Sequence, residues 1–162
     1  MTPETLLLPD DGTVPNNPRL PALLYRAAVP ADDPAGAEAI FAAHGWPPAW
    51  RNGIHPYHHY HPNAHEALAI ARGTVRVQLG GPAGPVLELA AGDVVALPAG
   101  VGHRNLDASA DLLVVGAYPA GQEPEENRAD RAVHDAAVQA ITATPDPPCE
   151  PVRGRPWPGL DA

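Results

Sequence analysis

The chain has 162 residues, which is enough for one domain with a single sizeable core. Its 19 acidic residues against 10 basic ones give a formal charge of -9, a poor match to a phosphate backbone, so we expect no nucleic-acid partner. No apolar run is long enough for a membrane span, the start lacks the pattern of a signal peptide, and the single cysteine cannot form an internal disulfide, so we expect a cytoplasmic protein.

The first third of the chain predicts an extended segment and a helix. Its many prolines and glycines favour short strands joined by turns, so the fold is expected to be mostly β. Residues 20–28 are interpreted as a strand at a sheet edge, where their proline is tolerated. An Asp-Asp-Pro start signal at 32–34 and apolar residues at helical spacing over 35–44 predict a helix that covers the sheet.

Two tryptophans follow this helix and bracket a pair of prolines. Trp46 and Trp50 could form an apolar plug over one end of the fold or a subunit contact. Alternatively, an indole and the adjacent Arg51 border a ligand cavity. The residues alone do not separate these alternatives, and Arg51 is the arginine that we would examine first for contact with an anionic ligand.

A histidine cluster over residues 53–73 is the most informative stretch. It holds five of the eight histidines: His55, His58, His59, His61 and His65. Neutral imidazole is the commonest metal ligand, and a nearby carboxylate often completes a site with open positions. Because side chains alternate along a strand, His59 and His61 can share one site, whereas His58 and Tyr60 point to the other face.

Glu66 is the carboxylate that could complete this site. It shares one face of a predicted strand with Leu68 and Ile70, whereas His65 shares the other face with alanines. Since the bulkier apolar side chains mark the inward face, Glu66 is the better ligand candidate and His65 the better structural one. A purely polar, histidine-rich surface loop is the alternative to this metal-site hypothesis.

Further strands are predicted beyond the histidine cluster. Residues 74–79 alternate with three apolar side chains facing inward, and a glycine-rich turn leads to a hairpin partner at 86–89. Residues 93–97 predict the next strand. Residues 112–118 are apolar at nearly every position, so this strand needs a cover on its outer face: the N-terminal segment, the helix at 35–44 or a second subunit.

The last part of the chain predicts a helix and a tail. Residues 123–142 are interpreted as a second helix, with an acidic start that suits the helix dipole. Residues 145–162 form a proline-rich tail that Trp157 and Leu160 could anchor and that is otherwise expected to be disordered.

Two spaced patterns resemble the two signatures of the cupin superfamily. The first extends over residues 53–73, where two glycines, two histidines and a glutamate stand at the spacing of the family. They are Gly53, His59, His61, Glu66 and Gly73.

The second pattern follows in the expected order over residues 92–107. Its members are Gly92, Pro98, Gly100 and His103. The final asparagine of the signature is replaced by Asp107, with Asn105 nearby. Further segments resemble the uncharacterised single-domain bacterial cupins called YjlB-like, at residues 15–18, 24–26, 45–53, 57–61 and 116–119.

The resemblance implies an all-β fold, the cupin double-stranded β-helix or jelly-roll barrel, with short flanking helices. Within one structural domain, residues 53–118 would form the barrel core, residues 1–52 an N-terminal extension with the edge strand and covering helix, and residues 119–162 the C-terminal helix and tail. It also implies that four side chains converge on one divalent metal ion: His59, His61, Glu66 and His103. Cupins are commonly dimers, so the resemblance favours a homodimer.

Three imidazoles and one carboxylate leave about two positions free on an octahedral ion, as in a metal centre that binds a substrate. These donors suit Fe, Mn, Ni or Zn without choosing among them. We expect a metal-dependent enzyme of the dioxygenase or isomerase type that acts on a small organic molecule inside the barrel. The candidates for proton transfer are Tyr57, Tyr60, His55 and His65.

Two alternatives remain open at this point. The protein could be a cupin that binds a metal or small ligand without catalysis, or one in which the metal only braces the barrel. Solvent access separates these possibilities, because an enzyme needs a channel to the ion whereas a structural brace is sealed.

Overall fold

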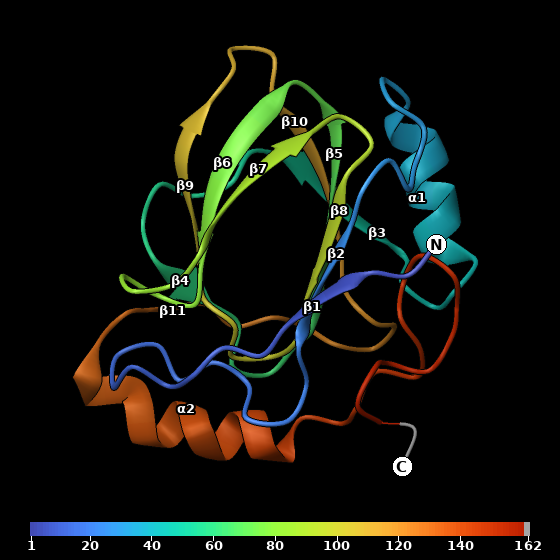
Figure 1. The fold of residues 1–162 in the computed structure, drawn as a ribbon. Helices are drawn as coiled ribbons and strands as arrows, with labels where there is room; N and C mark the ends of the chain where they lie inside the picture. The colour runs from blue at the N-terminus through green and yellow to red at the C-terminus, as the bar shows by residue number, and fades with distance from the viewer. Residues whose placement is uncertain (161–162) are drawn as a thin grey trace.

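The computed structural model describes residues 1–160 and consists of two antiparallel sheets with two helices outside them (Figure 1). The six-stranded sheet contains, in spatial order, β1 (Glu4–Leu6), β2 (Ala22–Tyr25), β8 (Val94–Leu97), β5 (Glu66–Arg72), β10 (Leu113–Ala117) and β3 (Pro48–Asn52). The five-stranded sheet contains β11 (Asn127–Arg128), β4 (His59–Tyr60), β9 (His103–Ala108), β6 (Thr74–Leu79) and β7 (Val86–Ala90). The expected mostly β fold with short helices, α1 (Pro34–Ala42) and α2 (Arg131–Ala143), is confirmed.

The N-terminal third contributes three strands to the six-stranded sheet. The prediction that residues 20–28 lie at a sheet edge is wrong, because β2 pairs with β8 on one side and with β1 on the other. The edge strand is therefore β1, which sequence reasoning missed. Pro21 directly precedes β2, where its missing N–H costs no ladder hydrogen bond. β3, also unpredicted, pairs with β10 at the opposite edge.

The helix predicted at 35–44 is confirmed over most of its length. The side chain of Asp33 caps its N-terminus by accepting the Gly36 N–H at 2.9 Å, and Pro34 occupies the first turn. The helix ends at Ala42, so His44 lies beyond its last turn.

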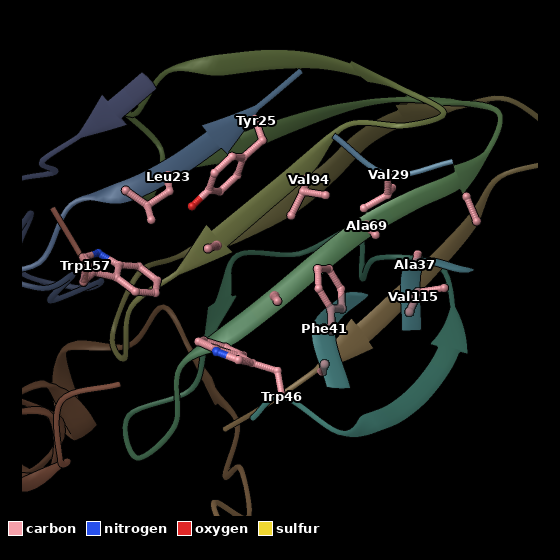
Figure 2. Packing of buried hydrophobic residues seen from close by; sticks show 14 of the residues in the cluster. Leu23, Tyr25, Val29, Ala37, Phe41, Trp46, Ala69, Val94, Val115 and Trp157 are labelled. Atoms are coloured by element: carbon pink, nitrogen blue, oxygen red, sulfur yellow. The ribbon is translucent and has the colours of Figure 1, made fainter. Parts of the chain in front are cut away.

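The outer face of the six-stranded sheet is covered by α1 and by the C-terminal tail (Figure 2). Phe41 from α1 packs against Val115 of β10, so the cover that this strand requires is the helix together with the tail. Trp46 and Trp157 lie in the same cluster and stack with their ring centroids 6.3 Å apart. The plug interpretation is therefore wrong for Trp46, which packs over a sheet face and not over one end of the fold.

The tail is ordered through residue 160. The expected anchoring by Trp157 and Leu160 is confirmed, since Trp157 is 1% exposed and Leu160 packs against the same cluster. The alternative of an unanchored, disordered tail is thus wrong for residues 145–160, and residues 161–162 lie outside the described part of the chain.

A buried carboxylate explains part of this order. Glu150 is fully buried, and it accepts a hydrogen bond from the Tyr25 hydroxyl and others from the amides of Arg153 and Arg155 at 2.6 and 3.0 Å. Burial and the Glu150 carboxylate raise the pKa of Tyr25 above its ordinary value, so this hydroxyl keeps its proton. Because a buried charge is tolerated only when it is hydrogen-bonded, these contacts hold the tail against β2.

The second helix is shorter than predicted. Instead of spanning 123–142, α2 begins at Arg131, where Asp130 caps it by accepting the Ala132 N–H at 2.9 Å. Residues 123–130 run extended and include β11. Pro124 disfavours a helical conformation only for Glu123, and the helix begins where Asp130 supplies the N-cap. In Figure 1, α2 crosses below one end of the barrel. Neither helix of the described residues is long and apolar enough to cross a membrane.

The space between the sheets is filled by a second apolar cluster. The predicted inward residues of β6 are buried, with Val75 at 2% and Val77 and Leu79 at 0% exposure, and they pack with Leu68 and Ile70 from β5. This apolar cluster does not fill one end of the barrel, where polar side chains lie instead.

Candidate metal centre

Strands from both sheets bring the histidine cluster and Glu66 together. His59 on β4 and His103 on β9 are directly paired across the five-stranded sheet. Glu66 is the first residue of β5 in the other sheet, and His61 is the residue directly after β4. The two separated sequence patterns therefore meet at one end of the barrel interior.

Three ligand atoms form a tight buried group. Glu66 Oε1 lies 3.1 Å from His103 Nε2, and Glu66 Oε2 lies 3.3 Å from His61 Nε2. The three side chains each offer a ligand atom within 4.8 Å of the others. His59 lies beside this group, with its ring centroid 4.0 Å from that of His103. The predicted ligands are thus neighbours, with His59 at a wider spacing than the other three.

Each of the three imidazoles turns its Nδ1 toward a backbone carbonyl. The pairs are His59 with Tyr57 at 2.9 Å, His61 with Glu125 at 2.7 Å and His103 with Val101 at 3.3 Å. A carbonyl oxygen only accepts, so in the neutral rings the proton resides on Nδ1 and the lone pair on Nε2. This is the usual arrangement of metal-binding histidines, in which the second nitrogen fixes the tautomer and ring orientation.

The position of Glu66 tests whether this group fits a metal ion. The Glu66 side chain is 3% exposed, and its Oε1 has no properly directed hydrogen bond among the described residues. An unpaired buried carboxylate oxygen is costly, and two imidazole lone pairs facing it at hydrogen-bond distance repel it. A cation between them removes both costs, so the residues fit a divalent metal ion.

The ionisation of the group agrees with this fit. Burial, reinforced by repulsion from His103, lowers the pKa of His59 to about 3. Burial alone would raise the pKa of Glu66, but its contacts with His103 and His61 outweigh burial and lower that pKa. Glu66 in turn raises the pKa of His61 despite burial, so a metal that binds there displaces a proton from His61. A neutral imidazole and an ionised carboxylate are the forms that bind metals.

Two of the candidates for proton transfer lie away from the centre. His65 accepts the Ala99 N–H at its Nδ1 at 2.9 Å and donates from Nε2 to the Pro145 carbonyl at 2.8 Å, so both its nitrogens are occupied. Tyr60 packs on the other side of its strand in a cluster with Val14. Neither side chain faces Glu66.

The other two candidates, His55 and Tyr57, lie at the edge of the site. Their rings stack with centroids 4.8 Å apart, and the Arg128 guanidinium lies 3.4 Å above the Tyr57 ring centroid. His55 Nε2 lies 3.3 Å from Glu126 Oε1. Of the two, His55 lines the cavity described next.

A cavity of about 350 Å³ lies beside the buried group. Its apolar wall includes Trp50, Ile54 and Leu68. At its mouth, the side chains of His55 and Glu126 are 52% and 37% exposed, so solvent reaches the cavity. This access is the property that distinguishes a ligand-binding centre from a sealed brace.

Tyr118 is a residue of the cavity that sequence reasoning did not identify. Its hydroxyl accepts the Trp50 indole N–H at 2.9 Å, and its ring meets that of His61 edge-on at a centroid distance of 5.6 Å. Burial and the charge of Glu66 raise the pKa of Tyr118 above its ordinary value. Alternation was the available signal, because Tyr118 shares the inward face of its strand with Val114.

The alternatives for Trp50 and Arg51 are separated by the structure. Trp50 lines the cavity, and Gly116 makes room for it, since a Cβ there would lie 2.1 Å from the indole. Arg51 points the other way along β3 and pairs with Glu38 at 2.6 Å. The alternative in which Arg51 borders the cavity is therefore wrong, because adjacent strand residues face opposite sides.

Residues 122–126, here called the mouth strap, hold His61 from outside. Asn63 fastens the strap by donating to the Glu123 carbonyl at 2.9 Å and accepting the Glu125 N–H at 2.8 Å. The Glu125 carbonyl then faces His61 Nδ1. Asn63 therefore holds Glu125 in place, and the Glu125 carbonyl in turn orients the candidate ligand His61.

Replacing Asn63 with alanine is expected to weaken divalent metal binding about tenfold, because loss of partners behind a ligating histidine has costs of this order. Competition with a chromophoric chelator measures the affinity. Gln78→Ala is the matched control, since the Gln78 amide donates to two carbonyls of a distant turn. Equal affinities of the Asn63 variant and this control would show that the mouth strap does not orient His61.

The comparisons with known proteins agree with the fold. Residues 51–115 match the family model described as the cupin domain. Over 158 residues the chain is 38% identical to the uncharacterized protein YjlB of Bacillus subtilis (strain 168), covering 98% of this chain and 94% of that protein.

Two solved structures are similar at lower identity. The DMSP lyase DddQ from Ruegeria pomeroyi DSS-3 matches with 21% identity and a TM-score of 0.37, over 68% of this chain and 43% of that one. The oxalate decarboxylase of Lactobacillus farciminis, in its formate complex, matches with 13% identity and a TM-score of 0.37, over 78% of this chain and 34% of that one. This chain spans less than half the length of either, and likenesses this distant concern the fold alone.

Proposed function

Since the chain belongs to the cupin family and is related over nearly its whole length to the YjlB protein, we propose that it binds one divalent transition metal and acts on a small organic molecule. The proposed ligands are His59, His61, Glu66 and His103, whose donors suit Fe, Mn, Ni or Zn. The observation that carries the proposal is the unpaired, buried Glu66 oxygen that faces histidine lone pairs beside a solvent-accessible cavity.

The reaction class that we propose is that of a dioxygenase or an isomerase. A bound divalent ion supplies a Lewis acid with open coordination positions. Trp50, Ile54 and Leu68 keep the inner wall apolar, so a ligand there is shielded from water. Tyr118 retains its phenolic proton and can donate it to a substrate oxygen, while the Trp50 N–H holds the hydroxyl in place. His55 Nε2, at the mouth, can exchange a proton with solvent.

The second candidate function is a cupin that binds a metal or a small ligand without turning it over. The same cavity and ligand set support it. A purely structural metal is disfavoured by the exposed His55 and Glu126 side chains at the mouth, because a brace needs no opening.

We further propose that the protein forms a homodimer and works in the cytoplasm. Support for the dimer comes from β7, which lies at an edge of the five-stranded sheet with Val86 exposed. An edge strand offers unpaired backbone groups to a second copy.

Elemental analysis of the purified protein without a histidine tag tests the metal proposal. We expect about one transition metal ion per chain, and none in a His59→Ala/His103→Ala variant, because such ions need several donors for retention. A His44→Ala/His134→Ala variant also loses two histidines, both outside the site, and should keep the metal. Full occupancy in the first variant would exclude its two residues from the centre.

A second measurement separates an enzyme from a binding protein. The metal-loaded protein is incubated in air with catechol, pyruvate and a set of small hydroxy acids, and proton NMR follows both substrate consumption and line broadening. Consumption that is lost in the His59→Ala/His103→Ala variant supports catalysis. Metal-dependent broadening without consumption across the set favours the non-catalytic role.

A further inference from the structure

The charged side chains that line the cavity are both acidic. Glu66 lies at its inner end and Glu126 at its mouth, and no arginine or lysine lines it within residues 1–160. The sequence contains no lysine at all, so every one of its 10 basic residues is an arginine. The wall therefore offers no cation to pair with a carboxylate that lies away from the metal.

The arginines nearest in sequence to the site are committed elsewhere. Arg51 pairs with Glu38 on the outer side of β3. Arg128 lies over the Tyr57 ring, outside the cavity lining. Arg104 follows His103 on β9 and so faces the opposite side of the strand.

Glu126 is held in place at the mouth. Its Oε1 lies 3.3 Å from His55 Nε2 and its Oε2 lies 3.4 Å from the Tyr57 hydroxyl. The mouth strap that carries it is fastened by Asn63. A carboxylate with a fixed position and an exposed edge attracts a positive group more effectively than a freely moving one, because less side-chain entropy is lost on pairing.

Charge balance at the two ends defines the ligand. A divalent ion beside the Glu66 carboxylate leaves one net positive charge, which favours one anionic oxygen donor. Glu126 at the other end favours a positive group. A second anionic group on the ligand would meet Glu126 with no arginine or lysine in the cavity lining to balance it.

From this distribution we infer that the cavity selects small zwitterions, with an anionic oxygen toward the metal centre and a cationic nitrogen toward Glu126, and that it discriminates against dianionic acids. The inference rests on the proposed function and specifies its substrate class.

Three probes of similar size test the inference by isothermal titration calorimetry on the metal-loaded protein. Glycine betaine and 3,3-dimethylbutyrate have the same shape and carboxylate, but a neutral carbon replaces the quaternary nitrogen in the second. Succinate supplies the dianion. We expect betaine to bind about threefold more tightly than dimethylbutyrate, from ion pairing with Glu126, and succinate to bind most weakly.

Variants of the mouth strap locate the effect. Glu126→Gln should remove most of the preference for betaine over dimethylbutyrate. Glu125→Gln removes the same charge from the neighbouring residue, whose side chain is outside the cavity lining, and should keep the preference. Equal loss in both variants would assign the preference to the net charge of the protein and overturn the assignment to Glu126.

The metal content of each sample distinguishes the two possible failures. A chain that binds no metal overturns the proposed function and, with it, this inference. A chain with about one metal ion that shows no betaine binding, equal affinities for the first two probes or tightest binding of succinate overturns the inference alone.

Discussion

Replacing Glu66 with alanine is expected to weaken divalent metal binding by more than about 100-fold, the upper range for changes in residues that only support a ligand. Both carboxylate oxygens face histidine Nε2 atoms, at 3.1 and 3.3 Å, so the change removes the only anionic donor of the group. The affinity is measured by competition with a chelator of known strength, after gel filtration and circular dichroism have confirmed that the variant is folded.

The adjacent residue supplies the control. His65→Ala removes a side chain whose two nitrogens are bound to Ala99 and Pro145, so it should lower stability and leave metal affinity nearly unchanged. The reverse order, with His65 more important for the metal than Glu66, would mean that β5 faces the other way in the protein.

Trp157→Ala is expected to destabilise the protein by about 3–5 kcal/mol, the range for large aromatic residues removed from a core. The Trp157 ring stacks on Trp46, its N–H donates to the Pro21 carbonyl at 2.9 Å, and its loss would also release the tail from the sheet. Urea unfolding of the full chain, followed by far-UV circular dichroism, measures the free energy difference.

A surface change on α2 provides the comparison for this experiment. Val138 is 38% exposed, so Val138→Ala should change stability by no more than about 0.5 kcal/mol. An effect of Trp157→Ala as small as that of Val138→Ala would show that residues 145–160 contribute little to the folded core.

Alternation along single strands made much of the fold predictable. It assigned Leu68 and Ile70 to the inside of the barrel and His65 to the opposite face, because each assignment depends only on neighbours in the sequence. The spacing of the two histidine patterns likewise pointed to His61 and His103 as members of one group.

Contacts between distant segments were not predictable in this way. The order of the tail depends on Tyr25 and Glu150, which are 125 residues apart, and neither has a local signal of the pairing. The place of Trp50 depends on the missing side chain of Gly116, on another strand. The predicted start of α2 was too early because the acidic residues at 123–126 are typical of a first helical turn, although Pro124 interrupts them.

The mouth strap links two properties of the centre. One residue of it, Glu125, orients His61 through its carbonyl, and the next, Glu126, borders the opening of the cavity. A small molecule that displaces Glu126 would therefore also disturb the support of His61, a proposed metal ligand. Because such linkage is reciprocal, an occupant of the cavity and a bound metal would change each other's affinity by the same factor, so the metal affinity of the protein would depend on the small molecule present.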